Sequence, residues 1–194
     1  MIAASNESPQ TQEQIIAAFD EQERASLAYW KAFDTASFFR GIGTSWSPAD
    51  TVRHLSKSTR PVVKALAMPT ILLRLMFGRA HRPSMTYDDL CGRYRQALSE
   101  GGQAGRFAPS GRSEEDLGAW REAIMDDYVR VNRDLRKTIA RWADGKLDRL
   151  QLPHPLLGKL TVREMLFFTL YHQRHHMSVV ERRLRESTER EGAS

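Results

Sequence analysis

Apolar side chains recur every three or four residues along most of the chain, which is the period of an amphipathic helix. The first such stretch begins near Ser8-Pro9, where a capping residue precedes a proline, and ends at Gly41. The second begins at Ser47-Pro48 with a serine cap and a first-turn proline, and it ends near Pro69. The pattern therefore predicts two long helices here, the second of them kinked at Pro61.

Two further helical stretches occupy the second half of the chain. One begins at Ser113, where acidic residues in the first turn suit the positive end of the helix dipole, and it ends at Gly145. The other opens with Thr161 and Glu164 in the arrangement of a capping box and runs past Leu184 into a charged tail. No alternating strand pattern interrupts these stretches, so the chain is expected to be an all-α four-helix bundle.

An irregular insertion is expected between the second and third helices. Residues 68–112 contain a short apolar piece, a brief helix over about 86–98 and the start of a loop at 101–113 that is rich in glycine and serine. The length of 194 residues suits a single domain over 1–194, with frayed termini at 1–8 and 187–194.

Composition and charge narrow the class of protein. Hydrophobic residues at 41% and charged residues at 27% are ordinary for a globular domain. The single cysteine excludes an internal disulfide, and no signal peptide or spanning segment is visible, so a cytoplasmic protein without a membrane partner is expected. The net charge of +5 raises nucleic acid as a partner, but there is no recognition motif and no basic stripe with interleaved aromatic residues.

Histidines supply the candidate chemistry. Of the six in the chain, His172 and His176 lie four residues apart on the fourth helix, so one helix face can present both imidazoles to a metal ion. They fall roughly 80° and 40° from the centre of that helix's apolar arc, whereas His175 falls roughly 140° away, toward solvent. The pair is also compatible with hydrogen-bonded histidines that bind no metal. The open candidates for a third ligand are His54, His81, His154 or a carboxylate.

Two segments of the chain carry a characteristic combination of motifs. Trp46-Ser47-Pro48 runs into Val52-Arg53-His54-Leu55, and the segment from His154 to Thr161 leads into His172-x-x-x-His176. Together these segments resemble the DinB-like (DinB/YfiT) superfamily. The resemblance implies a four-helix bundle of up-down-down-up topology in which His54, His172 and His176 hold a divalent metal. Periodicity alone does not nominate His54, because it lies roughly 110° off the centre of the apolar stripe on its helix.

The same resemblance implies a function. Three imidazoles with an open coordination position are typical of catalytic zinc sites. We therefore expect zinc or nickel and a metal-dependent enzyme of thiol-transferase or hydrolase type. Its substrate would be a small molecule, with a low-molecular-weight thiol as a candidate cosubstrate and a homodimer as a candidate assembly. The alternatives are a noncatalytic metal-binding or stress-response bundle and, with less support, a DNA-associated protein.

Several other residues have simpler interpretations beside a functional one. Asp50 either orients the imidazole of His54 or only caps its helix, and the cap already explains it. His154 either approaches the metal or forms a turn, with the turn favoured. Glu164 is explained as a cap. Cys91 has no nearby histidine, lysine or second cysteine in the sequence that would mark it as reactive, so it is expected to be a buried small side chain.

Overall fold

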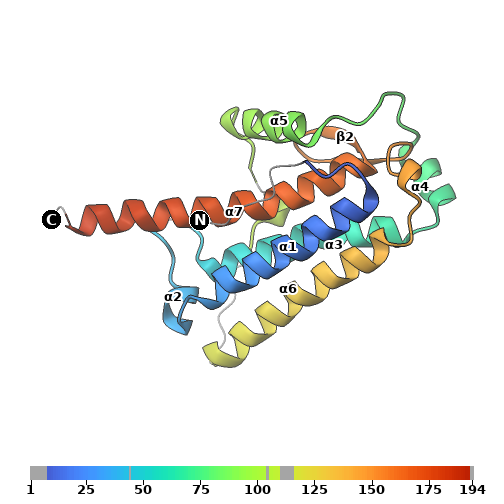
Figure 1. Ribbon diagram of the computed structural model, residues 1–194. Coiled ribbons are helices and arrows are strands. Elements are labelled where there is room, and N and C mark those ends of the chain that lie inside the picture. Colours follow the sequence, from blue (N-terminus) through green and yellow to red (C-terminus); the bar gives the residue numbers. More distant parts are fainter. Residues whose placement is uncertain (1–7, 44, 104, 110–115, 193–194) are drawn as a thin grey trace.

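The computed structural model describes residues 8–43, 45–103, 105–109 and 116–192 (Figure 1). Four long helices form a bundle. In Figure 1 the first and last of them run in one direction and the middle two run in the other, which is an up-down-down-up topology. The expected all-α four-helix bundle is confirmed. The long helices are α1 (Gln12–Lys31), α3 (Pro48–Ala67), α6 (Leu117–Ile139) and α7 (Val162–Gly192).

Shorter elements join the long helices. Residues 68–109 contain three of them, which confirms the expected irregular insertion between the second and third long helices. The helical ones are α2 (Thr35–Phe39), α4 (Thr70–Phe77), α5 (Tyr87–Ser99), η1 (Gly105–Phe107) and η2 (Asp144–Lys146). The strands β1 (Gln151–His154) and β2 (Gly158–Thr161) form an antiparallel hairpin in which Gln151 pairs with Thr161.

Local hydrogen bonding sets helix boundaries that differ from the predicted ones. The first helix begins at Gln12, not near Ser8, because Thr11 and Gln14 form a capping box. It ends at Lys31, and Asp34 then caps the separate helix α2. The predicted single stretch to Gly41 is therefore two helices.

The later long helices also depart from the predicted boundaries. Ser113, the predicted start of the third, lies outside the described residues, and α6 begins at Leu117 after its cap Asp116. It ends at Ile139, before the predicted Gly145. Helix α3 continues through Pro61, and α7 continues to Gly192, well into the tail for which fraying is expected.

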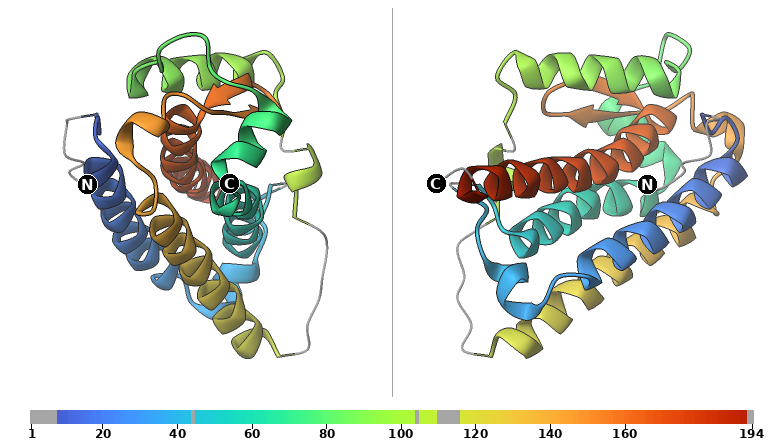
Figure 2. Two further views of the ribbon diagram at one scale, coloured as in Figure 1. Left: turned by 90° about the vertical axis from the view of Figure 1, so that its right-hand side faces the viewer. Right: turned by 60° about the vertical axis from the view of Figure 1, so that its left-hand side comes forward.

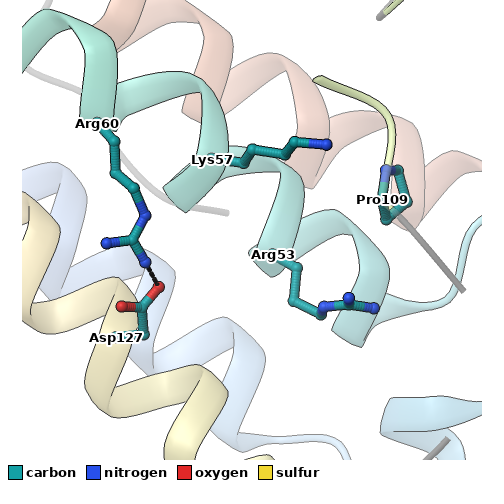
Figure 3. Close-up of a pocket in the computed structure, with 5 residues that line it drawn as sticks. All are labelled: Arg53, Lys57, Arg60, Pro109 and Asp127. Atoms are coloured by element: carbon teal, nitrogen blue, oxygen red, sulfur yellow. Dashed lines mark hydrogen bonds and ion pairs between the residues drawn. The ribbon is translucent and has the colours of Figure 1, made fainter. Parts of the chain in front are cut away.

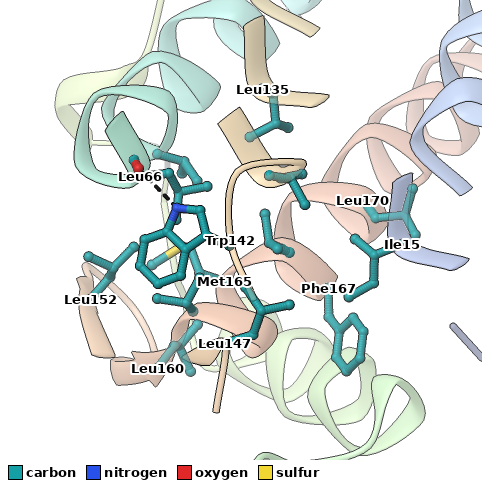
Figure 4. Packing of buried hydrophobic residues seen from close by; sticks show 14 of the residues in the cluster. Ile15, Leu66, Leu135, Trp142, Leu147, Leu152, Leu160, Met165, Phe167 and Leu170 are labelled. Atoms are coloured by element: carbon teal, nitrogen blue, oxygen red, sulfur yellow. Dashed lines mark hydrogen bonds between the residues drawn. The ribbon is translucent and has the colours of Figure 1, made fainter. Parts of the chain in front are cut away.

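Two apolar clusters form the core. The larger one lies between the bundle and the hairpin, and there the indole Nε1 of Trp142 donates to the carbonyl of Leu66 at 3.0 Å (Figure 4). The second surrounds the fully buried side chains of Trp30, Phe38 and Tyr128. Burial of this apolar surface holds the four long helices together.

Helix α5 packs against α7 and covers part of its outer face (Figure 2). The segment before α5 is tied to the start of α7, because the Arg82 guanidinium donates to the buried carboxylate of Glu164. The insertion after α3 therefore returns to the bundle and lies over the helices that carry the clustered histidines. None of the helices in the described parts of the chain has both the length and the apolar composition needed to span a bilayer.

Candidate metal centre

Three histidines from two helices meet between α3 and α7. His54 comes from α3, and His172 and His176 come from successive turns of α7. The Nε2 atom of His172 lies 3.2 Å from Nε2 of His54 and 3.0 Å from Nε2 of His176. One ligand nitrogen from each ring lies within 4.8 Å of the others. Three ring nitrogens therefore converge on one point, the geometry that a metal ion bound by three imidazoles requires.

A backbone carbonyl fixes the orientation of His54. Its Nδ1 lies 2.8 Å from the carbonyl oxygen of Phe107, and only a protonated Nδ1 can donate to that oxygen. The Nε2 atom then carries the lone pair and faces the other two histidines. The Nζ atom of Lys57 donates to the next carbonyl, that of Ala108, at 2.8 Å, so α3 holds this segment at two successive residues.

Asp50 does not orient His54. The backbone N–H of Asp50 donates to the Ser47 hydroxyl at 3.1 Å, and the carboxylate accepts from that hydroxyl at 2.9 Å and from Arg53 at 3.3 Å. These contacts agree with the capping interpretation. The partner that does orient His54 was not predicted, because the carbonyl of Phe107 belongs to the backbone and has no signature in the sequence.

Burial keeps the three clustered imidazoles neutral. It lowers the pKa of His54 below the ordinary value, an effect that outweighs the hydrogen bond to Phe107. Burial, together with repulsion among the neighbouring imidazoles, lowers the pKa of His172 and of His176 well below the ordinary range. Neutral imidazole is the form that ligates a metal, so near neutral pH the lone pairs of this cluster are available.

Aromatic rings line the cluster. The indole of Trp46 lies nearly parallel to the ring of His176, with centroids 6.2 Å apart and an interplanar angle of 8°. The same indole lies 5.0 Å from the ring of His54, and the ring of Phe168 stacks on His172 at 5.0 Å. These rings restrict imidazole rotation and form an apolar wall around the nitrogens, a surrounding that controls solvent access to a metal site.

The remaining candidate histidines lie outside the cluster. His175, which its phase places close to the solvent side, is half-buried, because the ring of Tyr94 on α5 packs within 5.9 Å of it. His154 forms the hairpin turn, where its Nδ1 accepts from the backbone N–H of Leu156 at 3.2 Å and of Leu157 at 3.0 Å. Burial lowers the pKa of His154 to about 4. His81 is exposed.

Cys91 and Glu164 have the structural roles expected of them. Cys91 is buried on α5, and burial raises the pKa of its thiol to about 11. The Glu164 carboxylate accepts from the backbone N–H of Thr161 at 2.7 Å while the Thr161 hydroxyl accepts from the backbone N–H of Glu164 at 3.1 Å. This is the predicted capping box, and it fixes the start of the helix that carries two of the histidines.

A small surface pocket of about 240 Å³ flanks the centre on the side of α6 (Figure 3). Its walls are Arg53, Lys57, Arg60, Pro109 and Asp127, and none of the clustered histidines is among them. Arg60 forms an ion pair with Asp127, and Lys57 holds the segment that orients His54. Arg60 and Lys57 therefore connect α3 to its neighbours.

Comparison with known proteins places the chain in a family. Two solved structures share its fold. TT2238, described as a four-helix bundle protein, has 17% identity and a TM-score of 0.53 over 88% of this chain and 98% of its own. YfiT from Bacillus subtilis, described as a probable metal-dependent hydrolase with an unusual four-helix bundle topology, has 16% identity and a TM-score of 0.50 over 99% of this chain and 94% of its own. No curated protein matches the sequence. Residues 18–180 match the DinB superfamily, and the chain belongs to that family.

Proposed function

We propose that the chain binds one divalent metal ion through the Nε2 atoms of His54, His172 and His176. The convergence of these three nitrogens within 4.8 Å is the observation that carries the proposal. The low pKa of each imidazole supports it, because a neutral ring keeps a lone pair that can bind a metal. The hydrogen bond from His54 Nδ1 to the carbonyl of Phe107 also supports it, because it places the lone pair of that ring on Nε2.

The donor set indicates which ions fit. It consists of imidazole nitrogens, and among the described residues no carboxylate joins the cluster. Magnesium and calcium prefer oxygen ligands, whereas zinc and nickel bind imidazole well. Zinc or nickel is therefore the ion we expect.

We infer further that the bound metal serves a reaction on a small molecule, either hydrolysis or transfer of a thiol. A divalent ion held by three histidines keeps an exchangeable position and lowers the pKa of the water or thiol bound there. Bacillus subtilis YfiT, which shares the fold, is described as a probable metal-dependent hydrolase. In the thiol variant the thiol would come from a cosubstrate, because Cys91 is buried and the pKa of its thiol is raised to about 11.

Within this reaction the chain's own residues would position and shield the reacting groups. The Phe107 carbonyl holds the His54 proton on Nδ1, away from the converging nitrogens. The rings of Trp46 and Phe168 lie against the imidazoles and limit the access of water. A homodimer and a cytoplasmic location stay predictions.

Metal titration of protein prepared without a polyhistidine tag tests the proposal. We expect one zinc or nickel ion per chain by calorimetry and elemental analysis, and loss of that ion in His54→Ala, His172→Ala and His176→Ala. His175→Ala is the matched control, because it lies on the same helix but outside the cluster, and it should retain the ion. Absence of stoichiometric binding, or equal losses in all four variants, would refute the assignment.

The enzymatic part has a separate test. The metal-loaded protein is assayed with ester and amide substrates, and with thiol–electrophile pairs, alongside His172→Ala. Turnover that depends on the metal and is lost in the variant supports an enzyme. Stoichiometric metal binding without turnover on any of these substrates would instead support the noncatalytic bundle.

A further inference from the structure

Helix α4 is apolar on the face that points away from the core as well as on the face that packs against it. Its inner face carries Leu73, which has no exposed surface, and Phe77. A helix that is apolar all round is normally buried on every side. In this chain the outer face of α4 is instead exposed to solvent. Its exposed side chains are Ile71 at 59%, Leu72 at 40%, Leu75 at 76% and Met76 at 55%.

This concentration of exposed apolar side chains is local. Only one other large apolar residue among those described is exposed to a similar degree, Leu117 at 39%. At about 100° per residue, the four α4 side chains occupy one continuous arc of roughly 140°. Helix α4 lies at the end of the bundle opposite the C-terminus (Figure 1). A contiguous exposed apolar patch of this kind marks an interaction surface.

The charges that flank α4 along the chain are of one sign. No acidic residue occurs between Asp50 and Asp88 in the sequence, so α4 lies within a segment whose only charges are positive. Arg74 is exposed on α4 itself, and Arg79 is exposed just after it. The Nζ atom of Lys159 donates to the carbonyl of Phe77 at 3.1 Å, which places a third cation at the end of the helix. The partner of this surface should therefore be anionic.

A second copy of the chain does not meet these requirements. Self-association through α4 would bring the same cations face to face, which is unfavourable. A helix of 8 residues is about 12 Å long. A stable interface buries about 800 Å² on each partner, more than two helical turns can supply.

We propose that α4 docks on an anionic lipid surface, with its outer apolar side chains in the headgroup region and the surrounding cations against the lipid charge. A short helix with protruding apolar side chains and flanking basic residues is typical of segments that lie in the membrane interface. This contact is peripheral, so it is compatible with the absence of a spanning helix among the described residues. It departs from the expectation of no membrane partner, which considered only spanning segments.

Vesicle co-sedimentation tests the proposal with the full chain. Wild-type protein should sediment with vesicles of phosphatidylglycerol and phosphatidylcholine, but not with phosphatidylcholine alone, and added salt should weaken the binding. The double variant Ile71→Ser/Leu75→Ser should bind about tenfold more weakly or worse. Arg74→Glu should weaken binding to the anionic vesicles as well. Leu117→Ser is the matched control, since it removes an exposed apolar side chain elsewhere, and it should bind as the wild type does.

Other outcomes would overturn the proposal. They are absence of binding to the anionic vesicles, equal weakening by the control variant, and a wild-type dimer in light scattering that the double variant abolishes, which would make α4 a self-association surface. Because the replaced residues are exposed, the variants should retain the wild-type circular dichroism spectrum and melting temperature. Metal stoichiometry should also be unchanged, so the result does not depend on the proposed metal centre.

Discussion

Replacement of Glu164 should destabilise the fold more than any surface substitution on the same helix. Its carboxylate has no exposed surface and accepts hydrogen bonds from the backbone N–H of Met85 at 2.7 Å, from the backbone N–H of Thr161 at 2.7 Å and from Arg82 Nη2 at 2.9 Å. One side chain thus caps α7 and ties the segment before α5 to it. The substitution Glu164→Ala removes all of these acceptors at once.

The expected loss in the free energy of unfolding follows from the number and burial of those donors. Hydrogen bonds to a charged group contribute about 1.5–3 kcal/mol each, and two backbone donors would lose such a bond. Arg82 contributes less, because its side chain is 43% exposed and can be rehydrated. We therefore expect Glu164→Ala to lower the free energy of unfolding by about 3–5 kcal/mol. Glu164→Gln, which keeps one acceptor oxygen, should lower it by about 1–2 kcal/mol.

Urea unfolding followed by far-ultraviolet circular dichroism measures this difference. Glu181→Ala is the matched control, because Glu181 is an exposed residue on the same helix that forms a surface ion pair with Arg185. Its effect should stay within about 0.5 kcal/mol. If Glu164→Ala is no more destabilising than Glu181→Ala, the carboxylate does not hold the two segments together and the reasoning is wrong.

The effect of Glu164 also has a defined pH dependence. Burial by itself raises the pKa of this carboxyl group, but the Arg82 guanidinium and the backbone N–H groups of Met85 and Thr161 together hold it below the ordinary value of 4.5. A carboxyl group with a lowered pKa in the folded state stabilises the fold above its unfolded pKa, and this contribution is lost as the pH falls through the folded value. The gap in stability between wild type and Glu164→Gln should therefore narrow below about pH 4.

Two further predictions follow from buried titratable groups. Cys91 should react slowly with a disulfide reagent at pH 8 in the native protein and rapidly in urea, because it is buried and the pKa of its thiol is about 11. Rapid labelling of the native protein would contradict this. The pKa values of His172 and His176 lie well below 6.5 in the fold, so the unfolded chain binds more protons below that pH. Urea midpoints of the metal-free protein should therefore fall as the pH is lowered from about 6.5, and less so in His172→Gln; equal slopes would contradict the assignment.

The long helices were predictable because each has a strong local signal. The serine cap and proline at Ser47-Pro48 and the capping box of Thr161 and Glu164 mark helix starts that the structure confirms. The hairpin of β1 and β2 was not predicted. Its strands have four residues each, too few to show a period, and the turn depends on the His154 ring and on a positive φ of 73° at Gly158.

The candidate site was only partly predictable, and the reason lies in how the two helices pack. The phase of the apolar arc on α7 correctly separates His172 and His176 from His175, because that arc and the histidine pair face the same side of the helix. On α3 the apolar arc is centred on a side of the helix that does not carry His54. That helix packs against α6, α7, α2 and η1, so it is buried on more sides than its apolar stripe shows.

His54 lies on a side of α3 that polar and aromatic groups cover. It is only 3% exposed, yet its contacts are the carbonyl of Phe107, the indole of Trp46 and the imidazoles of α7. Because the periodicity of apolar residues indicates only where apolar side chains are buried, a histidine enclosed by backbone and other imidazoles appears exposed in the pattern. In a helix with several packing partners, the apolar stripe indicates the core-forming side, and a polar residue far from it can still be buried. Only a structure reveals that second buried side.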